Sequence, residues 1–161
     1  MTVTVRAATL ADAPELARVQ GESWRLVYRG LMSDNVLDHP DFISYQTQVW
    51  TKALTTPSAE LKIAAALQDD QIIGVASSGP PRDDDATWDR QLYTMYVDAQ
   101  YYGQGVGEAL LDFVLKPDES AALFVAEANP RAVAFYRKHG FIPDGRIQDY
   151  KGIKSIRMVR A

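Results

Sequence analysis

Three glycines at alternate positions, Gly103, Gly105 and Gly107, stand between a strand-like segment and a helix-like segment of the chain. Residues 92–97 are rich in aromatic and branched side chains, whereas residues 105–116 repeat leucine and valine at helical spacing and are followed by a proline. Glycine adopts backbone conformations that other residues avoid and lets the main chain approach another group closely. The run therefore predicts a tight turn that leads from a strand directly into a helix, a connection typical of an α/β domain.

The rest of the chain shows two periodicities, alternation for strands and a spacing of three to four residues for helices. A polar turn at residues 68–70 joins two apolar runs, which predicts a hairpin, and a His39-Pro40 step breaks or restarts the second helical region. The predicted strands cover residues 3–7, 61–67, 71–78, 92–97, 121–127, 141–147 and 155–160, and the predicted helices cover residues 9–30, 33–54, 105–116 and 130–139. This order, β-α-α-β-β-β-α-β-α-β-β, predicts one α/β domain over residues 1–161, built around a single mixed sheet.

The composition limits the classes of function. A hydrophobic content of 47% over 161 residues fits a globular domain, and a net charge of −4 does not favour a nucleic-acid binder, which usually carries a basic face. The absence of cysteine rules out disulfides and a cysteine acyl-enzyme, and having only two histidines, His39 and His139, limits metal binding. No segment has the roughly 20 apolar residues of a membrane span. We therefore expect a soluble cytoplasmic protein without a metal, a nucleic-acid partner or a membrane partner.

The glycine run also suits a phosphate ligand. Its backbone N–H groups can approach a ligand closely, and the N-terminus of the following helix adds unpaired donors and the positive end of a dipole. The run is neither a nucleotide P-loop, which needs Gly-Lys-Ser/Thr, nor a Gly-x-Gly-x-x-Gly motif, because residue 108 is glutamate and residue 110 is leucine. A tight turn without any ligand is the alternative interpretation.

A second pattern begins where the strand at 121–127 gives way to a helix. Asn129 precedes Pro130, so its side chain is well placed to cap the helix N-terminus. Tyr136 follows seven residues later, two helical turns on, and therefore lies on the same side of the helix as Asn129. Its simplest interpretation is a core aromatic residue whose hydroxyl lies at the rim.

Together, residues 92–97, the glycine run and the segment from Asn129 through Tyr136 to the Gly-Phe pair at 140–141 resemble the signature of the GNAT acetyltransferase superfamily in order, spacing and placement. Residues 22–31 also resemble the first helical region of many bacterial members, so the resemblance covers essentially the whole chain. It implies the acyl-CoA N-acyltransferase fold, a mixed and largely antiparallel sheet flanked by helices. It also implies acetyl-CoA as the cofactor, coenzyme A as the product and no metal.

The resemblance implies a role for each part of the signature. The strand from Met95 to Val97 would bind the pantetheine arm through its backbone, and Asn129 would contact that arm or an ordered water. Tyr136 would donate a proton to the thioester sulfur as the general acid. Members of the family usually have arginine or glutamine at the position of Tyr102, so we expect weaker electrostatic help for the phosphates here. The implied cofactor-binding set is Met95, Tyr96, Val97, Tyr102, Gly103, Gln104, Gly105, Val106, Gly107, Glu108, Asn129 and Tyr136.

In such enzymes a neutral primary amine of a small molecule or peptide attacks the thioester directly in a ternary complex, and the general base stays open for this chain. Related enzymes often place a glutamate where this chain has Gln91 or where it has Phe124, and neither residue can serve. Asp89, Tyr93 and Glu127 are the candidates, beside a water chain with no dedicated base. Glu127 is the predicted catalytic carboxylate, with a solvated carboxylate at the strand end as the alternative.

The acceptor site is expected between the first helical region and the strand ends, with Trp24, Tyr28 and Tyr93 as candidate contacts. Trp50 could join them, although aromatic side chains on amphipathic helices more often belong to the core. The acidic loop at residues 82–85 is expected to be solvated surface. Two other functions stay open, a non-catalytic acyl-CoA-binding or sensing module and a transferase of a longer acyl group, as does a homodimer formed through the C-terminal strands.

Overall fold

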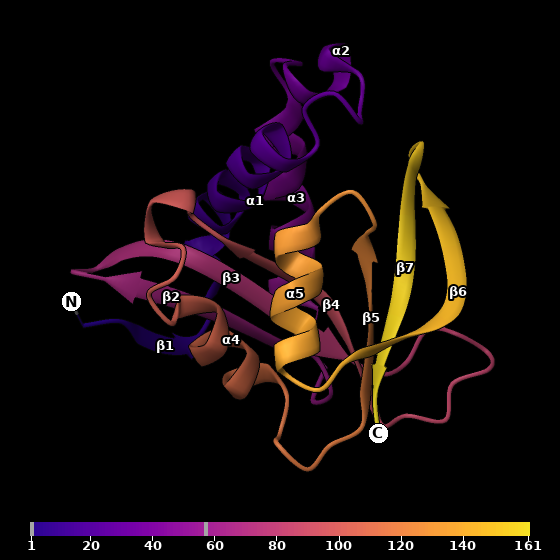
Figure 1. The fold of residues 1–161 in the computed structure, drawn as a ribbon. Coiled ribbons are helices and arrows are strands. Elements are labelled where there is room, and N and C mark those ends of the chain that lie inside the picture. Colours follow the sequence, from indigo (N-terminus) through magenta and orange to yellow (C-terminus); the bar gives the residue numbers. More distant parts are fainter. Residues whose placement is uncertain (1, 57) are drawn as a thin grey trace.

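The computed structural model describes residues 2–56 and 58–161 and shows one sheet with helices on both faces (Figure 1). The sheet has seven strands in the order β1-β2-β3-β4-β5-β7-β6. β4 and β5 run parallel, and the other neighbouring pairs are antiparallel, which confirms the predicted mixed and largely antiparallel sheet. The strands are β1 (Thr4–Ala7), β2 (Lys62–Gln68), β3 (Gln71–Gly79), β4 (Arg90–Val97), β5 (Ala121–Ala126), β6 (Ile142–Tyr150) and β7 (Ile153–Arg160).

The long helices form two layers on opposite faces of the sheet (Figure 1). α1 and α3 share an apolar cluster with Ile63 and Ala65, whereas α4 and α5 share one with Ala64 and Ala66. Successive residues of a strand face opposite sides of the sheet, so the apolar run of β2 serves both layers. The helices are α1 (Ala13–Val27), α2 (Asp34–Leu37), α3 (Phe42–Thr55), α4 (Val106–Val114) and α5 (Pro130–Lys138), with 3₁₀ turns η1 (Leu10–Asp12) and η2 (Ala99–Tyr101).

The second helical region is divided at the His39-Pro40 step, as predicted. α2 ends at Leu37 and α3 begins at Phe42. Proline has no N–H and disfavours helical backbone in the residue before it, so a single helix does not continue through this step.

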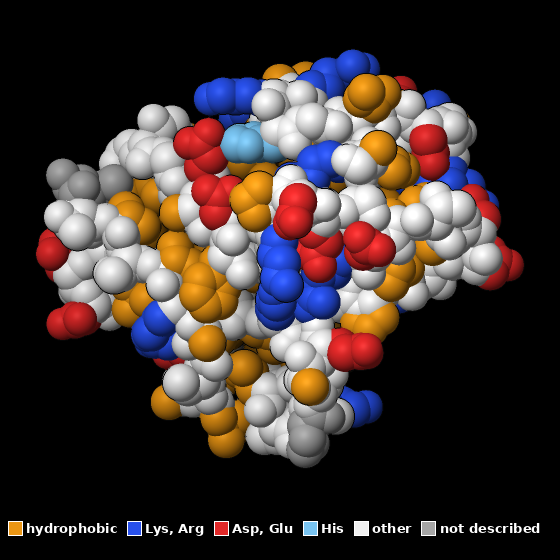
Figure 2. Space-filling view, turned by 90° about the horizontal axis from the view of Figure 1, so that it is seen from below, with side chains coloured by type: hydrophobic (Ala, Val, Ile, Leu, Met, Phe, Trp, Pro, Cys, Tyr) orange, Lys and Arg blue, Asp and Glu red, His pale blue; other side chains and the backbone are white. Residues whose placement is uncertain are grey.

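The surface mixes charged and apolar side chains. On the face drawn in Figure 2, Lys and Arg side chains lie beside Asp and Glu side chains, with hydrophobic side chains exposed between them. Within residues 2–56 and 58–161, no helix combines the length and the apolar character needed to cross a membrane.

The β4–β5 pair separates soon after it begins. Its parallel pairing is confined to Arg90 and Gln91 of β4. On the other side, β4 stays paired with β3, although the register shifts near Ser77, and a bulge of this kind bends a strand. In the part of the chain that the structure describes, residues 92–97 therefore have no strand partner on the β5 side, and a gap opens there.

A buried arginine connects the acidic loop at residues 82–85, which precedes β4, to the hairpin formed by β6 and β7. Arg157 of β7, whose exposed fraction is 5%, donates to Asp83 at 3.0 Å and to Asp85 at 2.8 Å. It also donates to Asp144 at 2.8 Å, and its guanidinium carbon lies 4.8 Å from the ring centre of Trp88. The prediction that this loop is solvated surface agrees with the exposed Asp84 and Asp85 and is wrong for Asp83, whose side chain is mostly withdrawn from solvent. Its cation lies 74 residues away in the sequence, so the sequence pattern does not reveal it.

Candidate active site

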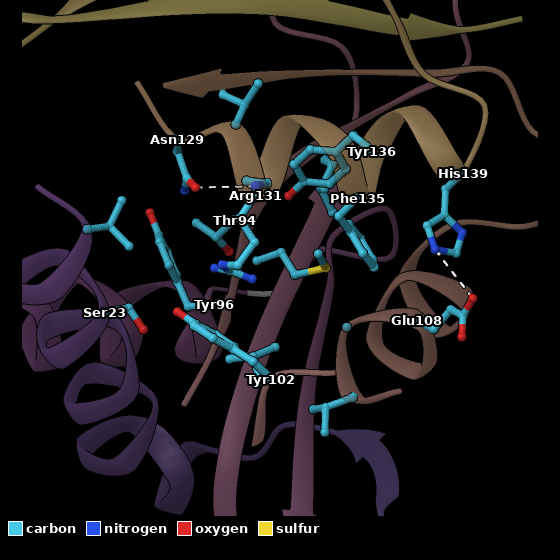
Figure 3. Close-up of a pocket in the computed structure, with 18 of the residues that line it drawn as sticks. Ser23, Thr94, Tyr96, Tyr102, Glu108, Asn129, Arg131, Phe135, Tyr136 and His139 are labelled. Carbon is cyan, nitrogen blue, oxygen red and sulfur yellow. Dashed lines mark hydrogen bonds and ion pairs between the residues drawn. The ribbon is translucent and has the colours of Figure 1, made fainter. Parts of the chain in front are cut away.

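A cavity of about 330 Å³ lies where β4 and β5 separate, between the turn before α4, the helix α5 and the end of α1 (Figure 3). Gln104, a predicted cofactor contact, does not line it, and its side-chain amide donates to the carbonyl of Gln100 at 3.3 Å. The other predicted cofactor residues all line the cavity, although they come from three separate parts of the sequence. They are Met95, Tyr96, Val97, Tyr102, Gly103, Gly105, Val106, Gly107, Glu108, Asn129 and Tyr136.

The glycine turn leaves room for a ligand to approach the backbone. Gly103 and Gly105 have φ angles of 77° and 83°, which favour glycine, and a Cβ on either residue would meet no atom within 4 Å. Gly107 instead serves packing, because a Cβ there would lie 3.3 Å from the ring of Phe135. Gly105 is the N-cap of α4 and offers no side chain to the first N–H groups of that helix. These donors and the positive end of the helix dipole therefore suit an anion at the cavity wall.

The unpaired edge of β4 forms another wall of the cavity. Met95, Tyr96 and Val97 lie in this wall, beyond the point where the pairing with β5 ends. Peptide groups on an unpaired strand edge can hydrogen-bond an extended ligand as they would an added strand. The gap between β4 and β5 therefore suits an elongated ligand that carries amide groups.

Tyr136 of α5 directs its hydroxyl into the cavity (Figure 3). Its side chain has an exposed fraction of 7%, and its ring packs edge-on against Phe135 and Phe141. Burial raises the pKa of the Tyr136 hydroxyl above its ordinary value of about 10, so the group is protonated at neutral pH. This residue therefore offers the cavity a neutral hydrogen-bond and proton donor.

Asn129 caps α5, as the sequence predicts. Its side-chain oxygen accepts the backbone N–H of Ala132 at 3.2 Å. The amide nitrogen of the same side chain carries two further donors, and the residue lines the cavity. One side chain can therefore hold the helix end and contact a ligand at the same time.

The α1 side of the cavity is aromatic. Tyr28 and Tyr93, two of the predicted acceptor contacts, line it. Trp24, the third, is not among the lining residues; it is buried, and its indole N–H donates to the hydroxyl of Tyr96 at 2.7 Å. Burial raises the pKa values of the Tyr28 and Tyr96 hydroxyls, so both stay neutral. Trp50 belongs to the core on the α1 face of the sheet.

Comparison with models of protein families identifies the family of this chain. A family model described as acetyltransferase (GNAT) domain matches residues 32–161. The chain belongs to the GNAT acetyltransferase family. An uncharacterized N-acetyltransferase of Bacillus subtilis strain 168, YuaI, is 30% identical over 163 residues, which cover 97% of this chain and 88% of that protein. The chain is thus an enzyme of the N-acetyltransferase class.

Two further proteins are similar to this GNAT chain, one in sequence and one in structure. A peptidyl-lysine N-acetyltransferase of Salmonella typhimurium, YjaB, is 28% identical over 109 residues, 66% of this chain and 68% of that protein. The solved structure of the PaiA N-acetyltransferase of Thermoplasma acidophilum, in complex with coenzyme A, has a TM-score of 0.76 and 21% identity and covers 99% of both chains. At that identity the likeness concerns the fold, and it agrees with the predicted acyl-CoA N-acyltransferase architecture.

None of the three predicted base candidates of this GNAT chain offers an unengaged side-chain group to the cavity. Glu127 pairs with Lys154 at 2.9 Å, both side chains are about half exposed, and Glu127 is absent from the lining. Asp89 is exposed and is also absent from the lining. Tyr93 does line the cavity, but its hydroxyl donates to the carbonyl of Pro80. For Glu127, the alternative interpretation as a solvated carboxylate at the strand end agrees with this geometry.

Three basic side chains from α5 and its C-cap also line the cavity, although the sequence analysis gave them no role in it. They are Arg131, Lys138 and His139. His139 lies 3.5 Å from the carboxylate of Glu108 at the start of α4 (Figure 3). The position of Arg131 is unusual in the sequence, because the helix dipole disfavours a cation in the first turn of a helix. This signal could have marked it as a functional residue. Lys138 and His139 carry no such signal, since cations are favourable at a helix C-terminus.

Proposed function

We propose that this chain transfers an acetyl group from acetyl-CoA directly to a primary amine of a small-molecule or peptide acceptor, with both substrates bound at once. One observation carries the proposal, the single cavity that joins the glycine turn, the unpaired edge of β4 and the hydroxyl of Tyr136. The relative named as a peptidyl-lysine N-acetyltransferase supports an amine acceptor. A non-catalytic acyl-CoA sensor would have no need of the hydroxyl donor.

The residues of the cavity fit an acyl-CoA. The turn from Gly103 to Glu108 offers backbone donors and open space to a pyrophosphate. Met95 to Val97 offer an unpaired strand edge to the amides of a pantetheine arm, and Asn129 adds a side-chain amide. Acetyl-CoA, when bound, supplies an activated thioester whose carbonyl carbon an amine can attack.

The chain contributes proton transfer and orientation. Tyr136 would donate its proton to the thioester sulfur as the carbon–nitrogen bond forms and the carbon–sulfur bond breaks. A backbone N–H on the unpaired edge of β4 would polarise the thioester carbonyl as charge develops on its oxygen. The proton lost by the amine would pass to water, since Asp89 and Glu127 lie outside the cavity wall. Of the groups that do line it, the Tyr93 hydroxyl donates to the carbonyl of Pro80, and His139 lies 3.5 Å from the carboxylate of Glu108. Because the chain has no cysteine for an acyl-enzyme, the rate depends on holding the two reactants in line.

The acceptor enters along the aromatic side of the cavity. Tyr28 and Tyr93 would contact it, since both rings line that wall. Trp24 would act indirectly by holding the hydroxyl of Tyr96. On this side, burial raises the pKa values of the Tyr28 and Tyr96 hydroxyls and keeps both neutral, which suits an uncharged amine at the moment of attack.

The pH dependence follows from the proton balance. An alkyl amine with a pKa of about 10.4 is mostly protonated at neutral pH, so kcat/KM should rise about tenfold per pH unit up to the pKa of the acceptor. Tyr136 does not limit this rise, because burial keeps its pKa above the ordinary value. Initial rates with two acceptors of different basicity provide the check, and the plateau should move with the acceptor. A plateau at the same pH for both would reveal an enzyme base and contradict the water route.

Isothermal titration with acetyl-CoA tests the proposal directly. The wild-type protein should bind it, and Gly105→Glu should weaken binding at least ~tenfold, because a carboxylate would enter the anion turn and a side chain would strain the positive φ. Gly105→Ala imposes the strain without the charge and should have a smaller effect. A screen of primary amines with the wild-type protein then separates an enzyme from a binding module.

A matched glycine on the edge strand β6 provides the control. Gly145 of β6 has a φ of 94° and open space around its Cβ position, and it lies outside the cavity lining. Gly145→Glu should therefore leave acetyl-CoA binding unchanged. Folded wild-type protein that binds no acyl-CoA would overturn the proposal, and equal weakening by both glutamates would remove the glycine turn from it.

A further inference from the structure

Arg131 reaches from α5 across the cavity to the glycine turn. Its guanidinium carbon lies 3.6 Å from the ring centre of Tyr102, the residue immediately before Gly103 (Figure 3). Both side chains line the cavity, although they belong to elements on opposite sides of it. The stacked pair therefore places a positive charge in the cavity that the glycine turn also lines.

Apart from stacking on Tyr102, the side chain of Arg131 makes no hydrogen bond or ion pair in the part of the chain that the structure describes. Within residues 2–56 and 58–161, no carboxylate forms an ion pair with Arg131, whereas Arg157 and Arg29 of the same chain each bind two or more. Its position in the first turn of α5 also opposes the helix dipole. A cation that is exposed to the cavity, unneutralised and unfavourable for its own helix is suited to an anionic ligand.

We propose that Arg131 supplies the cation for the pyrophosphate of acyl-CoA, and that Tyr102 orients it by stacking. The inference rests on the proposed function, because it names a further residue of the same site. The backbone donors of the turn at Gly103 to Glu108 bind the phosphates from one wall, and Arg131 binds them from the other. Tyr102 thus occupies the position where an arginine or glutamine is usual, while the charge itself comes from α5.

The other basic groups of the cavity do not duplicate this role. Lys138 and His139 lie at the opposite end of α5 from Arg131, and His139 is already close to the carboxylate of Glu108. Arg131 is also the residue whose guanidinium stacks on the ring of Tyr102, the residue that precedes the glycine turn. Its geometry can supply two parallel N–H groups to a phosphate, which a lysine cannot do.

Titrations with coenzyme A, dephospho-coenzyme A and pantetheine test the assignment. Arg131→Gln should bind coenzyme A and dephospho-coenzyme A about tenfold more weakly than wild type, the loss expected for one charge-assisted hydrogen bond. Binding of pantetheine, measured by competition, should stay unchanged because pantetheine has no pyrophosphate. Arg137→Gln is the matched control, because Arg137 is exposed on the same helix and outside the cavity lining.

A rescue variant separates charge from helix structure. Tyr102→Arg, placed in the Arg131→Gln background, returns a guanidinium to the turn itself and should restore most of the lost affinity. Tyr102→Leu alone removes the stacking ring and should weaken coenzyme A binding less than Arg131→Gln does. Restoration by arginine at position 102 is not expected if Arg131 only stabilises α5.

Several results would overturn the role of Arg131. Unchanged or tighter binding by Arg131→Gln would mean that the arginine makes no contact or obstructs the cavity. Equal weakening towards pantetheine would indicate a disturbed cavity, and a loss confined to coenzyme A would assign the contact to its 3′-phosphate. In each case the wild-type protein still binds coenzyme A, so the proposed function stands. A wild-type protein that binds none of the probes would overturn both.

Discussion

Replacing Tyr136 with phenylalanine is expected to lower kcat about 100-fold, the typical loss when a positioned acid is removed. The change deletes the hydroxyl that lies in the cavity and keeps the ring contacts with Phe135 and Phe141. Stability and acetyl-CoA affinity should therefore change little, so the defect should appear in kcat rather than in binding. Steady-state rates and titration with acetyl-CoA measure the two quantities separately.

Tyr93→Phe provides a matched control for the Tyr136 variant. Tyr93 also lines the cavity, but its hydroxyl donates to the carbonyl of Pro80. Tyr93→Phe keeps the ring that would contact the acceptor and removes only the hydroxyl that donates to Pro80, so kcat should stay close to the wild-type value. Near wild-type turnover by Tyr136→Phe would exclude the general-acid role, and a similar fall in kcat for both variants would point to a general effect on the cavity wall.

Replacing Arg157 with methionine is expected to lower the free energy of unfolding by about 3 kcal/mol, the lower end of the range for removing one partner of a buried ionic group. Three carboxylates would lose their shared cation, while Trp88 would keep an apolar neighbour. The loss is not larger because Asp85 and Asp144 remain partly open to water. Urea unfolding of both proteins at pH 7 gives the difference.

The same variant makes a prediction about pH. Hydrogen bonds from Arg157 lower the pKa of Asp85, so this carboxylate stabilises the fold above its unfolded pKa, and the contribution is lost as the pH falls through the folded value. The stability difference between wild type and Arg157→Met should therefore shrink below about pH 4. Arg146, half exposed and 3.6 Å from Asp85, is the control. Arg146→Met should cost less than ~1 kcal/mol, and an equal loss for both variants would contradict the importance of the buried site.

Local chemistry explains which features could be predicted from the sequence. Gly103 and Gly105 adopt the positive φ angles that alternate glycines between a strand and a helix suggest. Asn129 caps α5, and the His39-Pro40 step divides α2 from α3, because each depends on the conformational limits of neighbouring residues. Hydrophobic periodicity likewise identifies the strands of the sheet, since it marks the face that each element buries.

Contacts between segments that are far apart in the sequence could not be predicted from these local patterns. Periodicity states that a side chain is buried or exposed but not which element it meets. Glu127 follows β5 in the sequence, and only the pairing of β5 with β7 brings Lys154 against it. Trp24 similarly faces a hydroxyl 72 residues away and supports Tyr96 instead of lining the cavity.

The sequence by itself determined the α/β order, the turn at Gly103 to Gly107 and the side of α5 that carries Tyr136, because these depend on residues close together in the chain. Only the tertiary structure decided that Asp83 and Asp85 bind Arg157 and that Arg131 stacks on Tyr102 across the cavity. Those contacts depend on how the sheet orders its strands and where β4 leaves β5, which is a property of the packed chain as a whole.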